Sequence, residues 1–188
     1  MPPRTLVIFG GPDRCGKTTI AHELCRRTGA PYFKPTNQMK YAINDPACFT
    51  AQTLIAEPKL ADFLAQTGHS AVMDRSFVCD WAYSHALGRL EKMSLKDVGD
   101  WRATIEALDR TYGLMDALFV LCVRSSYAGR QDPGWSLMDG KMMATLDDLY
   151  RRYLEKTTMR RLVLNVDDED TGRQVTEIIR KLDNPWER

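Results

Sequence analysis

The sequence lacks the features that mark membrane proteins, secreted proteins and general nucleic-acid binders. No apolar run approaches the roughly 18 residues that a membrane span needs, so we expect no membrane contact. The five cysteines are odd in number and form no Cys-x-x-Cys pair, which disfavours a disulfide framework or a zinc ribbon. The net charge is only +1, which weighs against an extended polyanion-binding surface. The amino terminus turns polar by residue 14, too early for a secretory signal, so we expect a cytoplasmic, reducing location.

The composition is that of an ordinary globular protein. The chain has 188 residues, of which 44% are hydrophobic and 27% are charged. A chain of this size buries enough surface to fold without disulfides or metals. Because no repeat, low-complexity segment or linker interrupts it, we expect a single domain spanning residues 1–188.

Apolar runs alternate with helical periodicity along the chain. Strands are predicted at 6–9, 32–33, 70–73, 117–123 and 162–166. Helices are predicted at 18–27, 47–67 with a break near Pro58, 77–89, 95–112, 138–157 and 171–182, with Thr171 as the cap of the last. Strands that alternate with helices predict an α/β fold with a doubly wound parallel sheet and helices on both faces.

A phosphate-binding motif follows the first predicted strand. Gly11-Pro12-Asp13-Arg14-Cys15-Gly16-Lys17-Thr18 fits G-x-x-x-x-G-K-[ST] at every position. The glycines let successive backbone N–H groups turn toward one anion, and the next helix presents its amino terminus to it. Lys17 brings a charge to the phosphates, and the Thr18 hydroxyl can bind Mg²⁺. A chance match is expected in only about 1% of chains of this length.

The motif predicts binding of nucleotide phosphates but not the reaction. The sequence has no Asn-Lys-x-Asp, which a GTPase would be expected to carry, and the chain is short for a mechanical ATPase. A small kinase that uses ATP and Mg²⁺ fits the length best.

Several segments resemble the thymidylate kinase family. The family has an Asp-Arg pair inside its phosphate loop. Asp13-Arg14 stands at that place here, within the similar stretch 9–19 that ends at Thr19. It has a second Asp-Arg pair after its third strand, as at Asp74-Arg75, with Ala82-Tyr83-Ser84 at the usual spacing. The segment 49–52, Phe-Thr-Ala-Gln, is a weaker match. The resemblance spans most of residues 5–90 and implies a sheet of strand order 2-3-1-4-5.

The resemblance implies a role for each matching residue of the phosphate loop. Residues Gly11 to Thr19 would bind ATP, with Lys17 and Arg14 acting on the transferred phosphoryl group. Asp13 would accept a hydrogen bond from the 3′-hydroxyl of the acceptor, a contact that an ionised carboxylate makes well. A planar guanidinium at Arg14 suits phosphoryl transfer, which depends mostly on positioning and charge stabilisation.

The remaining roles concern the acceptor and the metal. Arg75 would bind the acceptor's 5′-phosphate, and Asp74 would lie near Mg²⁺ together with Thr18. Phe49 would stack on the base and Tyr83 would close the sugar pocket, although both aromatics also fit a core role on a helix.

Three positions depart from the family's pattern. Thr53 stands where the family usually has Arg, Ser76 follows Asp-Arg in place of an aromatic or His, and Lys34 is the only charge in the loop after the second strand. Thr53 and Lys34 stay in the predicted acceptor site, with Lys34 equally compatible with a solvated loop charge. The departures keep open a second hypothesis, a kinase acting on a hydroxyl of a deoxynucleoside or of a hydroxymethylated pyrimidine in DNA. Its base would be Asp74 or Asp13.

A polar segment after the fourth strand is predicted to be the lid, at about residues 124–136. Closure of such a segment excludes water, so that the phosphoryl group reaches the acceptor. Arg130 would contact phosphate, and a solvated loop charge is the alternative for this residue. Arg124 would lie against adenine. A turn at 167–170 is predicted to be a solvated acidic segment.

These expectations combine into one leading hypothesis. The chain would transfer the γ-phosphoryl of ATP, with Mg²⁺, to a deoxynucleoside monophosphate, with dTMP or a 5-substituted dUMP as the leading acceptor. The expected partner is this small molecule. Because thymidylate kinase-like proteins are often dimers, the resemblance also makes a second copy of the chain an expected partner, with the helix at 77–89 as the surface that could pack against it. A nucleotide-binding subunit without catalytic activity is the third hypothesis.

Overall fold

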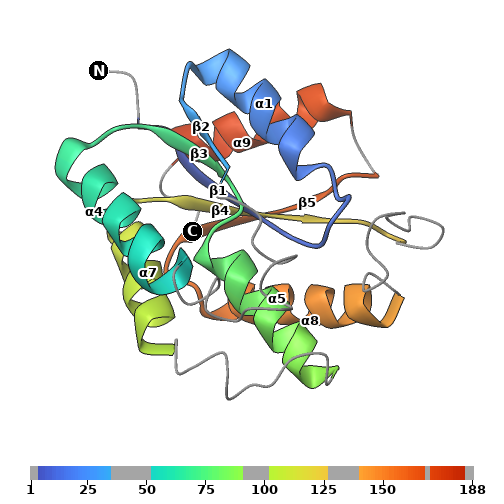
Figure 1. The fold of residues 1–188 in the computed structure, drawn as a ribbon. Helices are drawn as coiled ribbons and strands as arrows, with labels where there is room; N and C mark the ends of the chain where they lie inside the picture. The colour runs from blue at the N-terminus through green and yellow to red at the C-terminus, as the bar shows by residue number, and fades with distance from the viewer. Residues whose placement is uncertain (1–3, 35–51, 91–101, 127–139, 168–169, 185–188) are drawn as a thin grey trace.

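A computed structural model describes residues 4–34, 52–90, 102–126, 140–167 and 170–184. Its centre is a sheet of five parallel strands in the order β2-β3-β1-β4-β5, as predicted (Figure 1). The strands are β1 (Leu6–Gly10), β2 (Tyr32–Phe33), β3 (Ala71–Asp74), β4 (Leu118–Val123) and β5 (Arg160–Asn165).

The two central strands explain why the sheet needs helices on both faces. Every residue of β1 and β4 is buried, and successive side chains point to opposite faces. Leu6 and Ile8 join one core cluster, whereas Val7 and Phe9 join the other.

Helices α1 (Lys17–Thr28) and α9 (Thr171–Asp183) cover one face of the sheet. Ile20 and Leu24 of α1 and Val175 and Ile178 of α9 pack in the same core cluster. The strong segregation of apolar residues onto one side of each helix accounts for this placement.

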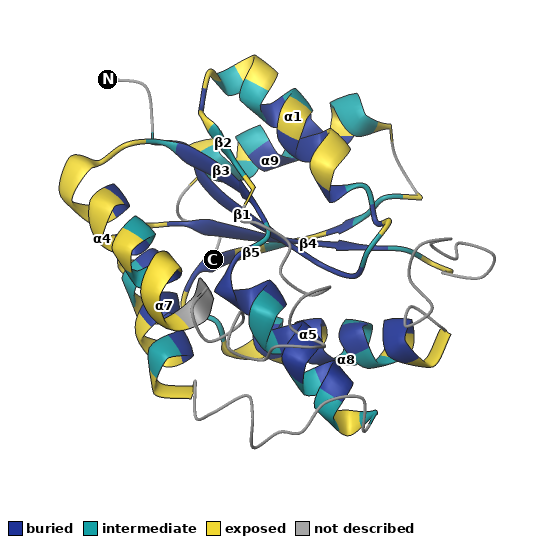
Figure 2. Ribbon diagram, in the orientation of Figure 1, coloured by how far each residue is buried: buried dark blue, intermediate teal, exposed yellow. Residues whose placement is uncertain are grey.

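The opposite face carries the remaining helices. These are a short π-helix, η1 (Gln52–Ala56), and α4 (Glu57–Thr67), α5 (Phe77–Arg89), α7 (Arg102–Leu114) and α8 (Gly140–Lys156). The buried sides of α4, α5, α7 and α8 join the core cluster on this face of the sheet, while the outer sides of α4 and α7 are largely exposed (Figure 2). The predicted break near Pro58 falls where η1 gives way to α4, with proline in the first turn, where its missing N–H costs no hydrogen bond.

The structure corrects two local predictions. β5 begins at Arg160, not at 162, because Arg160 pairs with Leu118 and so extends the ladder with β4. Asp170, not Thr171, caps α9: its side chain accepts a hydrogen bond from the backbone N–H of Arg173. Within the described residues, no helix combines the length and the apolar character needed to cross a bilayer.

The fold brings the carboxyl ends of β1, β3 and β4 to the same edge of the sheet. The chain order reverses at β1, whose neighbours are β3 on one side and β4 on the other. Such a switch point leaves a crevice at the strand ends, which is where open α/β sheets bind ligands. The residues that follow these three strands therefore form the candidate site.

Candidate active site

The phosphate loop runs from Gly11 to Gly16, between β1 and α1, in a conformation that depends on glycine. Gly11 has φ 127° and Gly16 has φ 75°. A Cβ atom at Gly11 would lie 2.2 Å from the carbonyl oxygen of Cys122, so the loop passes directly over the end of β4. Arg14 adopts φ 62° without being glycine, a strained backbone of the kind that collects at functional sites.

Lys17 lies at the start of α1, with its side chain folded over this loop. Its Nζ donates to the carbonyl oxygens of Gly11 (2.9 Å) and Pro12 (2.6 Å), and its residue is only 5% exposed. Burial alone would lower the pKa of Lys17, but the neighbouring Cys15 and Asp13 raise it above its usual value. The ammonium therefore stays charged beside the backbone that would cradle phosphates.

Asp74 ends β3 and is held by two hydroxyl donors. Its Oδ2 accepts hydrogen bonds from Thr18 Oγ1 (2.6 Å) and from the Tyr32 hydroxyl (2.9 Å), and Lys34 Nζ lies 3.5 Å away. Burial would raise the pKa of Asp74, but the hydrogen bonds from Thr18 and Tyr32 and the charges of Lys17 and Lys34 lower it overall. The carboxylate is therefore ionised at neutral pH.

The free oxygen of Asp74 suits a magnesium site. Asp74 Oδ1 is buried and has no hydrogen-bond partner within the described residues. No cluster of three or more His, Cys, Asp or Glu side chains surrounds it in that part of the chain. Mg²⁺ in nucleotide sites uses one or two protein oxygens and takes its other ligands from phosphates and water. The Thr18 hydroxyl and Asp74 Oδ1 fit this requirement.

Arg75 links the second Asp-Arg pair to the first. Its guanidinium donates to Asp13 Oδ1 in an ion pair and lies 5.5 Å from the centre of the Tyr83 ring. Burial lowers the pKa of Arg75, but Tyr83 and Asp13 more than compensate, so the pKa is raised overall. Arg75 also has a left-handed backbone, with φ 89°. Tyr83 itself is buried beneath this pair, and burial together with Asp13 raises its pKa.

Arg124, at the end of β4, ties the phosphate loop to the turn after β5. Its Nε donates to the carbonyl oxygen of Arg14 at 2.7 Å, and its Nη1 pairs with Asp167. Asp167 also accepts from the backbone N–H of Ser125 at 3.0 Å. The first residues of the predicted lid are thus bonded to the phosphate loop and to the turn after β5.

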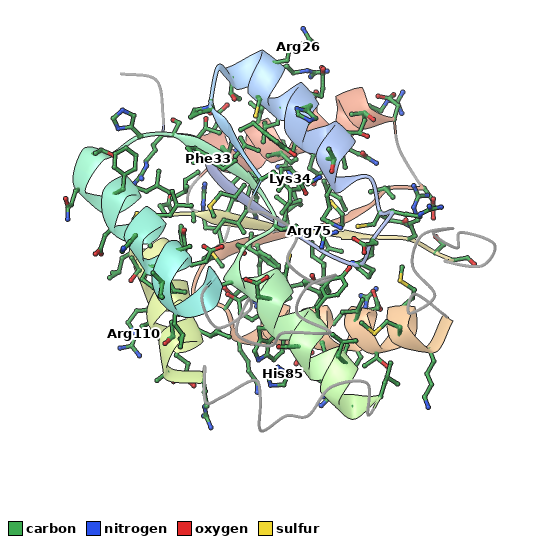
Figure 3. The ribbon with its side chains drawn as sticks, in the orientation of Figure 1. Arg26, Phe33, Lys34, Arg75, His85 and Arg110 are labelled. Atoms are coloured by element: carbon green, nitrogen blue, oxygen red, sulfur yellow. The ribbon has the colours of Figure 1, made fainter. Side chains whose placement is uncertain are left out.

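These side chains line one pocket of about 320 Å³. Two of its lining residues, Lys34 and Arg75, are labelled in Figure 3. The lining has a surplus of three positive charges and consists of Asp13, Arg14, Gly16, Lys17, Thr18, Thr19, Lys34, Asp74, Arg75 and Arg124. All ten are residues that the sequence predicts to belong to the site. The pocket is therefore built for an anion with several charged oxygens.

Comparison with known proteins identifies the architecture. No protein-family model and no curated protein matches the sequence. Among solved structures, the chain is similar to a deoxyadenosine kinase from M. mycoides with bound dATP, with 18% identity and a TM-score of 0.69 over 95% of this chain and 100% of that one. It is also similar to a thymidylate kinase from Candida albicans, with 15% identity and a TM-score of 0.63 over 97% of this chain and 92% of that one. The chain has the fold of these kinases.

Not every predicted site residue of this kinase fold can be placed. Phe49, Arg130 and most of the predicted lid lie outside the described residues, as does the side chain of Thr53. Lys34 is half-exposed and lies beside Asp74. Its ammonium thus lies in the pocket, not in open solvent.

Sequence reasoning missed two residues of the site. Tyr32 reaches Asp74 from β2 and stacks on His22 of α1, with ring centres 4.3 Å apart. Its position two residues before Lys34, on the same side of an extended segment, was the available signal. Asp167 lies in an exposed turn, as predicted, but its ion pair with Arg124 was not predicted.

Proposed function

We propose that the chain is a nucleotide kinase that transfers the γ-phosphoryl group of ATP to a deoxynucleoside monophosphate. We take dTMP or a 5-substituted dUMP as the leading acceptor. The observation that carries the proposal is the convergence of both Asp-Arg pairs with Lys17 and Thr18 in one cationic pocket. The thymidylate kinase among the similar structures supports the same reaction class.

The chain's own residues have distinct tasks in this proposal. Lys17, Arg14 and the loop N–H groups stabilise charge on the transferred phosphoryl group. Arg75 binds the acceptor phosphate once that phosphate takes the place of Asp13 as its partner. Asp13 is then free to accept a hydrogen bond from the sugar. Because an acceptor phosphate oxygen is already ionised at neutral pH, no general base is needed. A magnesium ion held by Thr18 and Asp74 would neutralise the phosphate charge.

One observation favours a second candidate, a kinase for a free deoxynucleoside. Arg75 is already paired with a carboxylate, so a dianionic acceptor must compete with Asp13 for it. A hydroxyl acceptor would instead meet Asp13 as a general base, held in place by Arg75. The deoxyadenosine kinase among the similar structures belongs to this class of acceptor.

Release of ADP from Mg-ATP across an acceptor panel tests the proposal. The panel contains dTMP, dUMP, 5-hydroxymethyl-dUMP, dCMP, dGMP, dAMP, thymidine, deoxyadenosine, and DNA with and without hydroxymethyluracil. We expect turnover with one pyrimidine monophosphate and none with the nucleosides. Turnover with a nucleoside alone would replace the proposal with the second candidate. No turnover with any acceptor, with ATP still bound, would indicate a nucleotide-binding subunit without catalytic activity.

A further inference from the structure

A second cavity lies away from the phosphate loop, where α5, α7 and α8 meet. It measures about 680 Å³, about twice the volume of the phosphate-loop pocket, and no residue lines both. We call it the α5–α7–α8 groove, defined by Trp81, His85, Arg110, Arg152, Tyr153 and Lys156. In Figure 3, His85 and Arg110 lie below the sheet, away from Arg75. Its volume falls within the range of pockets that hold a small organic ligand.

Positive charge is concentrated in this groove. Five cationic side chains line it against Glu106 and Asp109, a surplus of three in a chain whose net charge is +1. Glu106 pairs with Arg102, and Arg89 and Arg152 share Asp148, which lies outside the lining.

Neither Glu106 nor Asp109 forms an ion pair with the two remaining cations of the groove, Arg110 and Lys156. Asp109 is buried and accepts hydrogen bonds from Tyr153, Thr157 and Thr158. Arg110 and Lys156 make no ion pair with any described residue. These two side chains are therefore available to an anion.

One wall of the groove is aromatic. The rings of Trp81 and His85 lie 4.9 Å apart, and Trp81 also lies 6.0 Å from Tyr153. Burial lowers the pKa of His85, so the imidazole is neutral at pH 7. These rings are tilted to one another by 40° and 47°, so a planar group can pack on one of them. An aromatic wall beside Arg110 and Lys156, which have no ion pair among the described residues, suits a ligand that has both a planar ring and phosphate groups.

We propose that the α5–α7–α8 groove is a second nucleotide-binding site, separate from the phosphate-loop pocket. The base packs against Trp81 and His85, and the phosphates lie toward Arg110 and Lys156. An acidic peptide would use the same cations but would leave the ring wall unexplained. Because the cations are exposed, binding weakens as the salt concentration rises.

The number of bound nucleotides per chain tests this proposal directly. We would use equilibrium dialysis with the β,γ-imido analogue of ATP and Mg²⁺, without acceptor, at low salt. The wild-type chain is expected to bind two equivalents. Arg110→Glu/Lys156→Glu is expected to bind one, with the second weakened by more than about tenfold. Lys59→Glu/Lys141→Glu makes the same charge change on exposed helix positions outside both cavities and is expected to bind two.

Each alternative result has a defined meaning. A single equivalent in the wild type, or two retained in Arg110→Glu/Lys156→Glu, would overturn the proposal. A wild-type dimer with one equivalent per chain, converted to monomer by this variant in sedimentation velocity, would assign the groove to a second copy instead. If the variant loses both equivalents through misfolding, the milder Arg110→Gln/Lys156→Gln decides by the same criteria. Turnover is not measured, so failure here leaves the proposed reaction intact.

Discussion

The phosphate-loop pocket and the α5–α7–α8 groove carry the same surplus of positive charge but are built in opposite ways. In the pocket, Lys17 is 5% exposed and the Arg75 side chain is 17% exposed. In the groove, Arg102 and Arg152 are 85% and 61% exposed. Lys17 and Arg75 are held against the loop carbonyls and Asp13, whereas Arg102 and Arg152 extend outward from regular helices. The pocket is therefore suited to chemistry, and the groove to weaker binding that depends on salt.

Helix α5 belongs to both regions. It begins directly after Asp74-Arg75, with Ser76 as its cap, and its Tyr83 lies under Arg75. Trp81 and His85 of the same helix line the groove. The two regions thus share a rigid element but no lining residue, so substitutions can separate them.

The largest expected effect comes from Lys17→Met. This change keeps the length of the side chain and removes the ammonium beside the loop carbonyls. Loss of one preorganised charge in a dry site typically lowers kcat by about 10²- to 10³-fold. Steady-state kinetics with Mg-ATP would measure it, with Lys59→Met as a control at an exposed position. Undiminished kcat would exclude this pocket as the site of phosphoryl transfer.

Arg75→Ala is expected to act on the acceptor more than on ATP. Removal of a partly buried guanidinium that binds a phosphate through charge-assisted hydrogen bonds should raise the acceptor KM by about 100-fold. The KM for ATP should change much less, and Arg75→Lys should recover part of the loss because it restores the charge without the planar fork. An equal rise in both KM values would show that Arg75 serves the whole pocket and not the acceptor phosphate.

Tyr32→Phe should produce a smaller effect that depends on pH. It removes one of the two hydroxyl donors to Asp74, so the pKa of that carboxylate rises. The ionised form is the one that binds metal, and activity is lost as the pH falls through the pKa. The acid limb of kcat/KM should therefore move to higher pH, with little loss at neutral pH, where the carboxylate is ionised in both proteins.

Tyr112→Phe is the matched control for this change. Its hydroxyl is buried without a hydrogen-bond partner in the described residues, and it packs on Phe77. Removing that hydroxyl should leave the pH profile unchanged. A parallel shift in both variants would mean that the loss reflects general loosening and not the position of Asp74.

The sheet and most of the phosphate-loop pocket could be predicted from the sequence because both follow local rules. Apolar runs marked β1 and β4, and the phosphate-loop motif fixed the geometry from Gly11 to Thr18. The Asp-Arg pairs followed from resemblance, and the strand order then brought them together. The ion pair between Asp13 and Arg75 did not follow, because it joins positions 62 residues apart.

Tyr32 and the α5–α7–α8 groove were also beyond sequence reasoning. A tyrosine in a two-residue strand carries no periodic signal, and its partner Asp74 lies on the neighbouring strand β3. The groove depends on how three helices pack on one another, which their separate patterns do not specify. Residues with regular spacing were thus predictable, and residues that meet through packing were not.

The smallest expected effect comes from two substitutions that place glycine once in each region. Arg14→Gly replaces a left-handed residue, with φ 62°, by the residue that adopts this conformation most easily. Arg110→Gly instead places glycine inside α7, where it costs about 1 kcal/mol relative to a good helix former. Thermal unfolding should therefore show Arg110→Gly to be less stable than Arg14→Gly by about 1–2 kcal/mol. Arg14→Gly should still lose activity, because its guanidinium is absent. If Arg14→Gly proves the less stable of the two, then contacts of its side chain, and not backbone strain, dominate at this position.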